Sequence, residues 1–329
     1  MKLEAVGLDV YKWHDKVIAQ DTVLTDEKPF LIYNSLTIKE GVKLTIEENA
    51  HFYFRRNASF HIYGSVDIQG TVEKPVILRG DRFDKISGDI PFDNVPGQWG
   101  GVYFYGDSYN NRIDNVVIKN STSGVYFAKS DPDIKKASLV NTVIQNSSNM
   151  GLYAVSCDID ATNCLFANTA NATVALIGGK YSFTHCTIAN YYRWSVRINP
   201  SLVVSNLAES GAVPLTRCDI RNSIVYGGID EEVRLINVSA AQFDYQFTNC
   251  VLKGESVSNA HFENIIWNSN PLFKNLNNNG DFSYSFQLSG GSPAIDKADD
   301  SYMPPTDIRG KARPNGLKAD LGCYEWYGE

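Results

Sequence analysis

Carboxylate side chains gather in two polar stretches of the chain, where they could carry acid–base chemistry. Asp84 and Asp93 lie in the first stretch, and Asp131 and Asp133 lie in the next one. Glycoside hydrolysis requires two carboxyl groups, one protonated and one ionised, that face each other across the scissile bond. A polysaccharide lyase would instead need a base and a cation, such as Arg197, to neutralise a uronate. These five residues are the catalytic candidates.

A simpler explanation is that these carboxylates are solvated turn residues, which is how loop carboxylates usually occur. No established catalytic motif accompanies them: the sequence has no P-loop, no G-x-G-x-x-G, no H-E-x-x-H, no C-x-x-C and no G-x-S-x-G. The sequence therefore leaves open whether the protein is an enzyme.

A repeated phrase shows how the chain must position such residues. Asn, a small or β-branched residue, two apolar or β-branched residues, any residue, and then Asn or Gly recur six times. The copies open at Asn115, Asn141, Asn163, His185, Asn222 and Asn249, between 22 (163−141) and 37 (222−185) residues apart. A second phrase, Gly-(Val/Leu)-Tyr-(Phe/Ala), begins at Gly101, Gly124 and Gly151. A recurring period of this length indicates that one structural unit is repeated along the chain.

Each period carries at least two short strands with alternating apolar residues, and no helical pattern separates them. Strands that recur once per turn without helices indicate a coil whose turns stack ~4.8 Å apart into long parallel sheets. The Asn or Gly that closes each phrase tolerates a left-handed backbone at a sharp bend. The sequence therefore predicts an all-β, single-stranded parallel β-helix.

Equivalent positions of consecutive turns should be neighbours in such a coil. The opening column is expected to form a ladder of side-chain amides in which His185 can join. The second position takes small side chains, so Cys164, Cys186 and Cys250 are expected to be buried thiols rather than disulfides.

The second phrase predicts an outward column of tyrosines. If Val102, Val125 and Leu152 point inward, the tyrosine after each of them points outward, and Leu176, Arg197 and Arg234 are expected to continue the column. Sugar rings stack on aromatic faces, and guanidinium groups pair with uronate or sulfate. The predicted carbohydrate-binding residues are Trp99, Tyr103, Tyr105, Tyr126, Tyr153, Arg197 and Arg234. The alternative is that stacked tyrosines only stabilise the sheet.

The end of the sequence resembles a known family. Gly291-Ser292-Pro293-Ala294-Ile295-Asp296, then Asp307, Gly310 and Arg313, then Asp320-Leu321-Gly322-Cys323-Tyr324-Glu325 resemble the "GSPAID…D…G…R…D-hydrophobic-GAYE" ending of bacterial right-handed parallel β-helix repeat proteins. Cys323 stands where Ala is usual. The resemblance covers residues 23–329 and implies a right-handed β-helix and export to a Gram-negative cell surface. Similar proteins often begin with a lipoprotein signal and an immunoglobulin-like domain.

These observations divide the chain into three parts. Residues 1–22 are expected to be a remnant strand or linker from a preceding immunoglobulin-like domain, and residues 23–270 the β-helix. An open last coil must be covered, so residues 271–329 are predicted to form a loop-rich C-terminal cap. In this cap we expect Arg313 to pair with Asp296 or Asp320.

Charge and composition limit the partners. A net charge of −7 and a pI near 5.3 argue against a nucleic-acid partner. No apolar run approaches the ~18 residues of a membrane-spanning helix. The resemblance, rather than the composition, implies an extracellular or outer-membrane-surface location, with membrane contact only through a lipid anchor outside this sequence; we also expect a monomer. No metal or cofactor is expected, although residues 277–281 (Asn-Asn-Asn-Gly-Asp) offer oxygens to Ca²⁺.

Three functions remain open, because parallel β-helices host all of them. The leading hypothesis is a secreted or surface-anchored protein that binds polysaccharide along the outward Tyr/Arg face. The first alternative is a polysaccharide lyase or glycoside hydrolase that acts on an acidic glycan. The second is a non-catalytic structural or adhesin scaffold.

Overall fold

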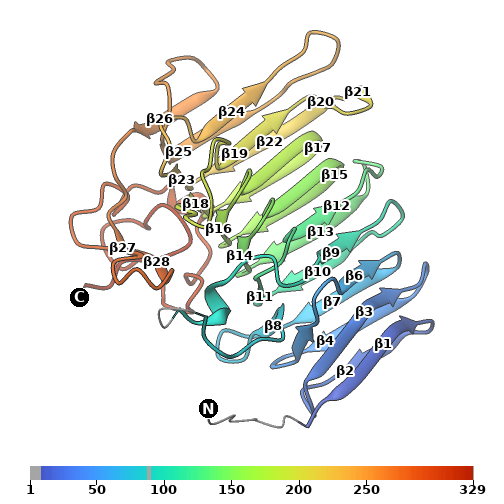
Figure 1. Ribbon diagram of the computed structural model, residues 1–329. Helices are drawn as coiled ribbons and strands as arrows, with labels where there is room; N and C mark the ends of the chain where they lie inside the picture. The colour runs from blue at the N-terminus through green and yellow to red at the C-terminus, as the bar shows by residue number, and fades with distance from the viewer. Residues whose placement is uncertain (1–8, 87–89, 329) are drawn as a thin grey trace.

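The computed structural model describes residues 9–86 and 90–328, and it shows an all-β parallel solenoid (Figure 1). Strands of successive coils pair in parallel, and the pairings form three long sheets, which we call A, B and C. The predicted β-helix is therefore confirmed. No helix within the described ranges is long and apolar enough to cross a membrane.

Each coil except the last, which has no strand in sheet B, contributes one strand segment to each sheet in turn, and the longest strands bend from one sheet into the next. Sheet A stacks β1 (Tyr11–Ile18), β3 (Phe30–Ile38), β5 (His51–Phe54), β8 (Val76–Gly80), β11 (Val116–Lys119), β14 (Val143–Ser147), β16 (Leu165–Thr169), β18 (Thr187–Asn190), β23 (Ile224–Gly227), β25 (Gln246–Leu252) and β26 (Phe262–Trp267). Sheet B stacks the second halves of β1 and β3, then β6 (Ser59–Ile62), β9 (Gly101–Phe104), β12 (Val125–Phe127), the first halves of β15 (Leu152–Thr162) and β17 (Val174–Thr184), β19 (Leu202–Ser205) and β24 (Val233–Ile236).

Sheet C completes the coils. It stacks β2 (Thr22–Leu24), β4 (Lys43–Glu47), β7 (Ser65–Gln69), β10 (Asn111–Asp114), β13 (Lys135–Val140), the second halves of β15 and β17, β22 (Leu215–Arg221) and the first parts of β25 and β26. Among the described residues, the elements outside the three sheets are the hairpins β20 (Leu207–Ala208)–β21 (Gly211–Ala212) and β27 (Phe273–Leu276)–β28 (Tyr284–Leu288), and the 3₁₀ turns η2 (Phe92–Asn94) and η3 (Asp300–Tyr302).

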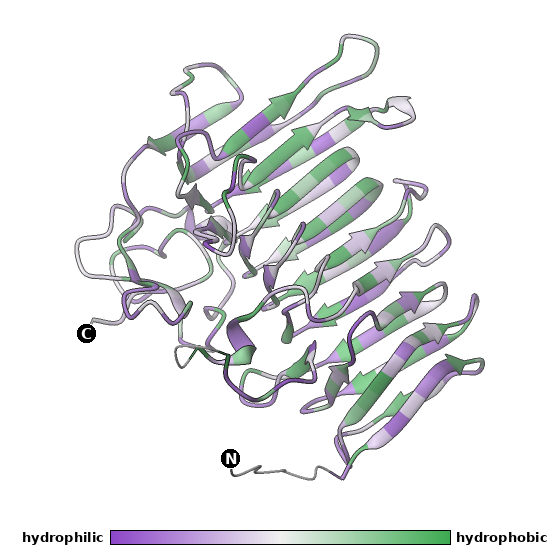
Figure 2. Ribbon diagram, in the orientation of Figure 1, coloured by the Kyte–Doolittle hydropathy of each residue, from purple (hydrophilic) through white to green (hydrophobic). Residues whose placement is uncertain are grey.

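Alternating side chains fill the interior of the coil, as the period-2 pattern predicted. Val102, Val125 and Leu152 are buried, and the rings of Phe104 and Phe127 stack inside with their centroids 4.6 Å apart. Figure 2 shows hydrophobic and hydrophilic residues alternating along many of the strands. Burying this continuous apolar column is the main favourable term in the stability of the solenoid.

The first residue of each repeat turns the chain from sheet C into sheet A. All six opening residues have a positive φ, for example +60° at Asn163 and +51° at His185. Asn163 Nδ2 donates to Asn141 Oδ1 at 3.0 Å, and Asn222 Nδ2 lies 3.0 Å from His185 Nε2. The predicted ladder is therefore present in pieces; Asn115 instead donates to Asp114 Oδ1.

Cys164, Cys186 and Cys250 are buried thiols, as the repeat predicted, and the other three cysteines share this state. All six are buried and unpaired, and Cys164 Sγ donates to the Thr162 carbonyl at 3.3 Å. Burial raises the pKa of Cys186 and, to about 12, that of Cys250, so these thiols remain protonated.

The β-helix begins earlier than predicted. Residues 11–18 form β1, which pairs in parallel with β3, so they belong to the first coil rather than to a linker that ends at residue 22. Residues 1–8 of this expected strand or linker lie outside the described residues.

The C-terminal segment also differs from the prediction. Instead of crossing the open last coil, its apolar residues form a second core with the outer face of sheet A, where Leu321 and Cys323 pack with Leu165, Ile224 and Val251. Figure 1 shows this segment beside the stack of β14 to β25. Arg313 pairs with Glu325 at 3.0 Å, not with Asp296 or Asp320, because Asp320 accepts hydrogen bonds from two backbone N–H groups.

Candidate functional site

The tyrosines of the second repeat form a column on the outside of sheet B. The strand registers align Tyr103 with Tyr126 and Tyr126 with Tyr153. The ring centroids of Tyr103 and Tyr126 are 6.1 Å apart at an angle of 46°, and those of Tyr126 and Tyr153 are 5.5 Å apart at 8°. All three side chains are half-buried.

The aromatic column extends in the N-terminal direction through residues that the sequence analysis did not include. His61 occupies the same register one coil earlier and lies 5.5 Å from the Tyr103 ring. Tyr105, which was predicted, hydrogen-bonds through its hydroxyl to His61 Nδ1 at 2.9 Å and stacks on Tyr63 at 4.1 Å. Burial and the neighbouring Tyr63 raise the pKa of Tyr105 to about 12. The alternation Phe60-His61-Ile62 was the signal that could have identified His61.

A groove of about 440 Å³ lies against this column. One side is formed by residues 208–210 at the tip of the β20–β21 hairpin, and the other by Ser123, Asn149 and Met150. Lys129 and Glu209 also line it. Burial raises the pKa values of Tyr126 and Tyr153, and the charge of Glu209 adds to this effect. The phenol groups are therefore neutral hydrogen-bonding groups.

The stacking of the column ends at Tyr153. The next positions in register are Ala175, Val203 and Arg234, in that order. Arg234 is outward and exposed, as predicted, and lies three coils from Tyr153, or ~14 Å. The prediction that Leu176 continues the column is wrong, because Leu176 aligns with Ala154 and points into the core. Ala175 carries no ring, so one face of the Tyr153 ring has no aromatic partner among the described residues.

Arg197 does not lie in the column. Its guanidinium group is buried and paired with Glu232, whose side chain has no exposed surface. Arg197 Nη1 also donates to the Asn199 carbonyl and Nη2 to the Asn190 carbonyl, both at 2.8 Å. This network fixes the loop 191–201, so Arg197 is not available to a ligand.

The prediction that Trp99 binds carbohydrate is also wrong. Only 1% of its surface is exposed, and its ring stacks on Phe54 at 4.2 Å inside the coil. Its indole Nε1 donates to the Lys119 carbonyl at 2.9 Å. A buried ring with a satisfied N–H cannot present a face to a sugar.

The catalytic candidates lie apart from the groove. Asp93 pairs with Arg79 at 2.9 Å and Lys119 at 2.7 Å, which extend from sheet A, and Asp84 pairs with Arg82. Asp133 pairs with Lys180, which extends from sheet C, at 2.5 Å.

Asp131 belongs to the same turn as Asp133. Its Oδ1 accepts the backbone N–H of Asp133 at 2.9 Å. Glu209 is the carboxylate among the residues that line the tyrosine groove. The described structure therefore does not bring two carboxyl groups and an arginine together beside the tyrosines.

The possible calcium ligands at residues 277–281 form a turn. Asn277 Oδ1 accepts the Phe282 N–H at 2.6 Å, and Asp281 Oδ1 accepts from the Ser283 hydroxyl at 2.6 Å. Within the described part of the chain, no group of three or more His, Cys, Asp or Glu side chains is arranged to hold a metal ion.

Comparison with solved structures finds proteins of similar fold. A crystal structure of the pectate lyase Pel9A resembles this chain with a TM-score of 0.40 and 13% sequence identity, over 97% of this chain and 86% of that chain. No family model matches the sequence, and no curated protein matches it.

Proposed function

We propose that the protein binds a polysaccharide in the groove beside Tyr103, Tyr126 and Tyr153. The observation that carries the proposal is the end of the aromatic column at Tyr153, where Ala175 follows in register and the hairpin tip approaches. A sugar ring can stack on the Tyr153 face that has no aromatic partner, while Tyr126 supports the other face. The phenol hydroxyls, Asn149 and Glu209 supply donors and acceptors for sugar hydroxyls.

The outer faces of the other two sheets offer less to a sugar. The outside of sheet C carries ion pairs between neighbouring coils, such as Lys43–Asp67 at 3.0 Å and Lys135–Asp158 at 2.7 Å. The later strands of sheet A are covered by the C-terminal segment. Sheet B is where half-exposed aromatic side chains line a groove.

Binding to polysaccharides in solution tests the proposal. Affinity electrophoresis through gels that contain single polysaccharides should show retardation of the wild-type protein by at least one of them. Tyr153→Ala should weaken that binding about fivefold to tenfold, because one stacking contact is lost, whereas Tyr153→Phe should retain most of it.

A matched control is Tyr53→Ala, because Tyr53 is a half-buried tyrosine on the outside of sheet A. It should bind like the wild type. If Tyr153→Ala and Tyr126→Ala both bind every polysaccharide as the wild type does, the tyrosines only stabilise the sheet, and a scaffold role becomes the better explanation. We also propose that the protein works as a monomer at an extracellular or outer-membrane surface, which sedimentation and cell fractionation would test.

A further inference from the structure

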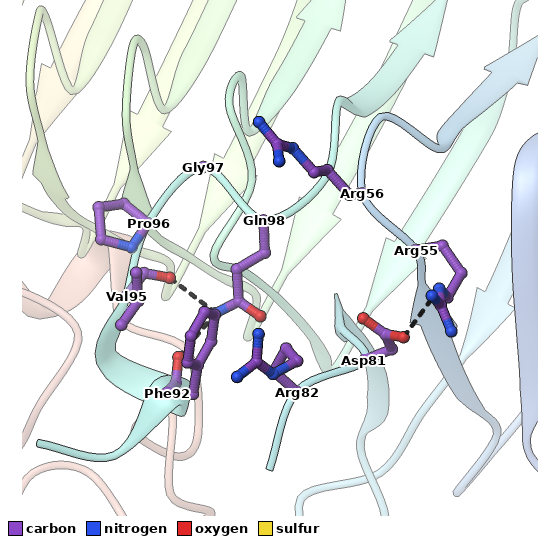
Figure 3. Close-up of a pocket in the computed structure, with 9 residues that line it drawn as sticks. All are labelled: Arg55, Arg56, Asp81, Arg82, Phe92, Val95, Pro96, Gly97 and Gln98. Carbon is purple, nitrogen blue, oxygen red and sulfur yellow. Dashed lines mark hydrogen bonds and ion pairs between the residues drawn. The ribbon is translucent and has the colours of Figure 1, made fainter. Parts of the chain in front are cut away.

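A second hollow of about 440 Å³ lies at the corner between sheets A and B (Figure 3). Three chain segments form it: the turn after β5, the start of the loop after β8, and the segment that leads into β9. The lining side chains that matter are Arg55, Arg56, Asp81, Arg82, Phe92 and Gln98.

Positive charge dominates this hollow, with three guanidinium groups and one carboxylate among its lining residues. Arg55 Nε pairs with Asp81 Oδ2 at 3.2 Å, and Arg82 pairs with Asp84 outside the hollow. Arg56 makes no ion pair or hydrogen bond with the described residues. Since two of the three arginines are balanced by carboxylates, Arg56 carries the surplus charge.

The wall of the hollow is rigid and contains an unused acceptor. Gln98 is 9% exposed, and its Nε2 donates to the carbonyls of Phe92 and Val95, both at 2.7 Å. These bonds fix the amide so that Oε1 faces away from both carbonyls, and Oε1 has no donor among the described residues. In Figure 3 this oxygen lies on the side of Arg82. Oε1 is itself buried against Gly80, where a Cβ would lie 2.1 Å from it, so the Gln98 amide acts as a fixed part of the wall rather than as a ligand-binding group.

Arg82 is held in place by a second contact. Its guanidinium carbon lies 4.0 Å from the centre of the Phe92 ring, which is a cation–π distance. A ligand would therefore meet an arginine whose side chain is already ordered by Asp84 and Phe92, and less conformational entropy would be lost on binding.

We propose that this hollow binds a carboxylate or sulfate group of the polysaccharide that lies in the tyrosine groove, so that the glycan is an acidic one. The inference rests on the proposed function. Planar guanidinium groups bind such oxyanions through paired hydrogen bonds.

The two sites are close enough for one chain to reach both. Gln98 and Tyr103 are five residues apart in the sequence (103−98), which limits their separation to ~17 Å. The Tyr103 hydroxyl also donates to the Gly100 carbonyl at 3.4 Å, so the tyrosine leans toward this corner. The net charge of −7 repels a polyanion elsewhere on the surface, so the arginine corner would fix where the acidic groups lie.

The test compares Arg56→Ala with Lys39→Ala. Lys39 is exposed at the corner between sheets B and C, so its variant removes the same charge at a different place. Affinity electrophoresis would use polygalacturonate, dextran sulfate and neutral dextran. Polygalacturonate and dextran sulfate distinguish a carboxylate from a sulfate. We expect Arg56→Ala to weaken binding of one acidic polymer about tenfold, and Lys39→Ala to match the wild type.

Equal effects of the two variants, or equal binding of neutral and acidic polymers by the wild type, would overturn the proposal. Calorimetric titration with sodium sulfate and with galacturonate separates it from the proposed function. One outcome would be that Tyr153→Ala leaves polysaccharide binding unchanged, while the small anions bind to the wild type and not to Arg56→Ala. The hollow would then be an oxyanion site, and its link to the groove would be refuted. If no anion binds to the wild type, the oxyanion site itself is refuted.

Discussion

Replacing His185 with Asn should make the stability of the protein less sensitive to acid. His185 opens the fourth repeat, where the other five copies have Asn, and its side chain is fully buried. Its Nε2 accepts a hydrogen bond from Asn222 Nδ2, which requires a neutral ring. Burial, reinforced by the positive charge of Arg313, lowers the pKa of His185 to about 3.

The direction of the effect follows from the two protonation states. Above pH 6.5 the imidazole is neutral in both the folded and the unfolded chain, so it contributes no pH dependence. As the pH falls from 6.5 towards 3, the unfolded chain takes up a proton that the folded chain excludes, and the free energy of unfolding decreases. At pH 5 the gap of 1.5 pH units, at 1.36 kcal/mol per unit, amounts to about 2 kcal/mol.

Thermal unfolding of the two proteins at pH 7.5 and pH 5.0 measures this term. For 329 residues the unfolding entropy is roughly 0.7 kcal/mol/K, so 2 kcal/mol corresponds to ~3 °C. The wild-type Tm should therefore fall by ~3 °C more than that of His185→Asn. Asp320, whose pKa burial raises to about 6, contributes with the opposite sign, but it is present in both proteins and cancels in the difference. Equal decreases in Tm would refute the reasoning.

Two further predictions concern stability. Glu232→Ala should lower the free energy of unfolding by ~3–5 kcal/mol and the Tm by ~4–7 °C, because it leaves Arg197 buried without its carboxylate. Asp219→Ala removes the partly exposed pair with Arg221 and should cost less than ~1 kcal/mol. Calorimetry would measure both, and equal losses would contradict the assigned burial. Asn163→Ala should be less stable than Asn163→Gly by about 1 kcal/mol in urea denaturation, because φ is +60° and both variants lose the hydrogen bond to Asn141. An alanine variant as stable as the glycine variant would show that the backbone relaxes.

The repeat was sufficient to predict the coil and the first part of the tyrosine column. Asn141 and Asn163 open consecutive copies of the repeat, 22 residues apart, and were therefore predicted to be neighbours. Their side chains are in contact. The same reasoning aligned Tyr103, Tyr126 and Tyr153, because all three copies keep the glycine that marks the start of the strand. Where every copy of the repeat keeps the glycine at the start of the strand, the sequence defines the register.

The predicted continuation of the tyrosine column failed where this glycine is missing. β17 lacks the Gly-x-Tyr phrase, and an alignment error of one residue exchanged Ala175 for Leu176, which reverses the face of the sheet. Val196-Arg197-Ile198 alternates like a strand but belongs to the loop before β19. In the same way Trp99 precedes β9, at a corner where no alternation shows which way a side chain points.

The position of the C-terminal segment follows from a pattern that the sequence analysis did not use. In sheet A the early strand β11 alternates between buried and half-buried residues, whereas all residues of β16, β18 and β23 are buried. A strand that is apolar on both faces requires a cover on its outer face. Leu165, Ile224 and Val251 supply that outer apolar surface, and residues 271–329 cover it.

The same reasoning separates two parts of sheet B, because the outer residues Ala175 and Ile177 of β17 are buried, whereas β9, β12 and the first half of β15 keep a half-exposed outer face. On these three strands the outer positions carry tyrosines, whose hydroxyl groups tolerate water while their rings still offer apolar area. These side chains remain half-exposed beside the hairpin tip. A face that is neither covered by the chain nor neutralised by ion pairs is the one on which an external partner gains the most contact area, and this is the physical basis for placing the polysaccharide on sheet B.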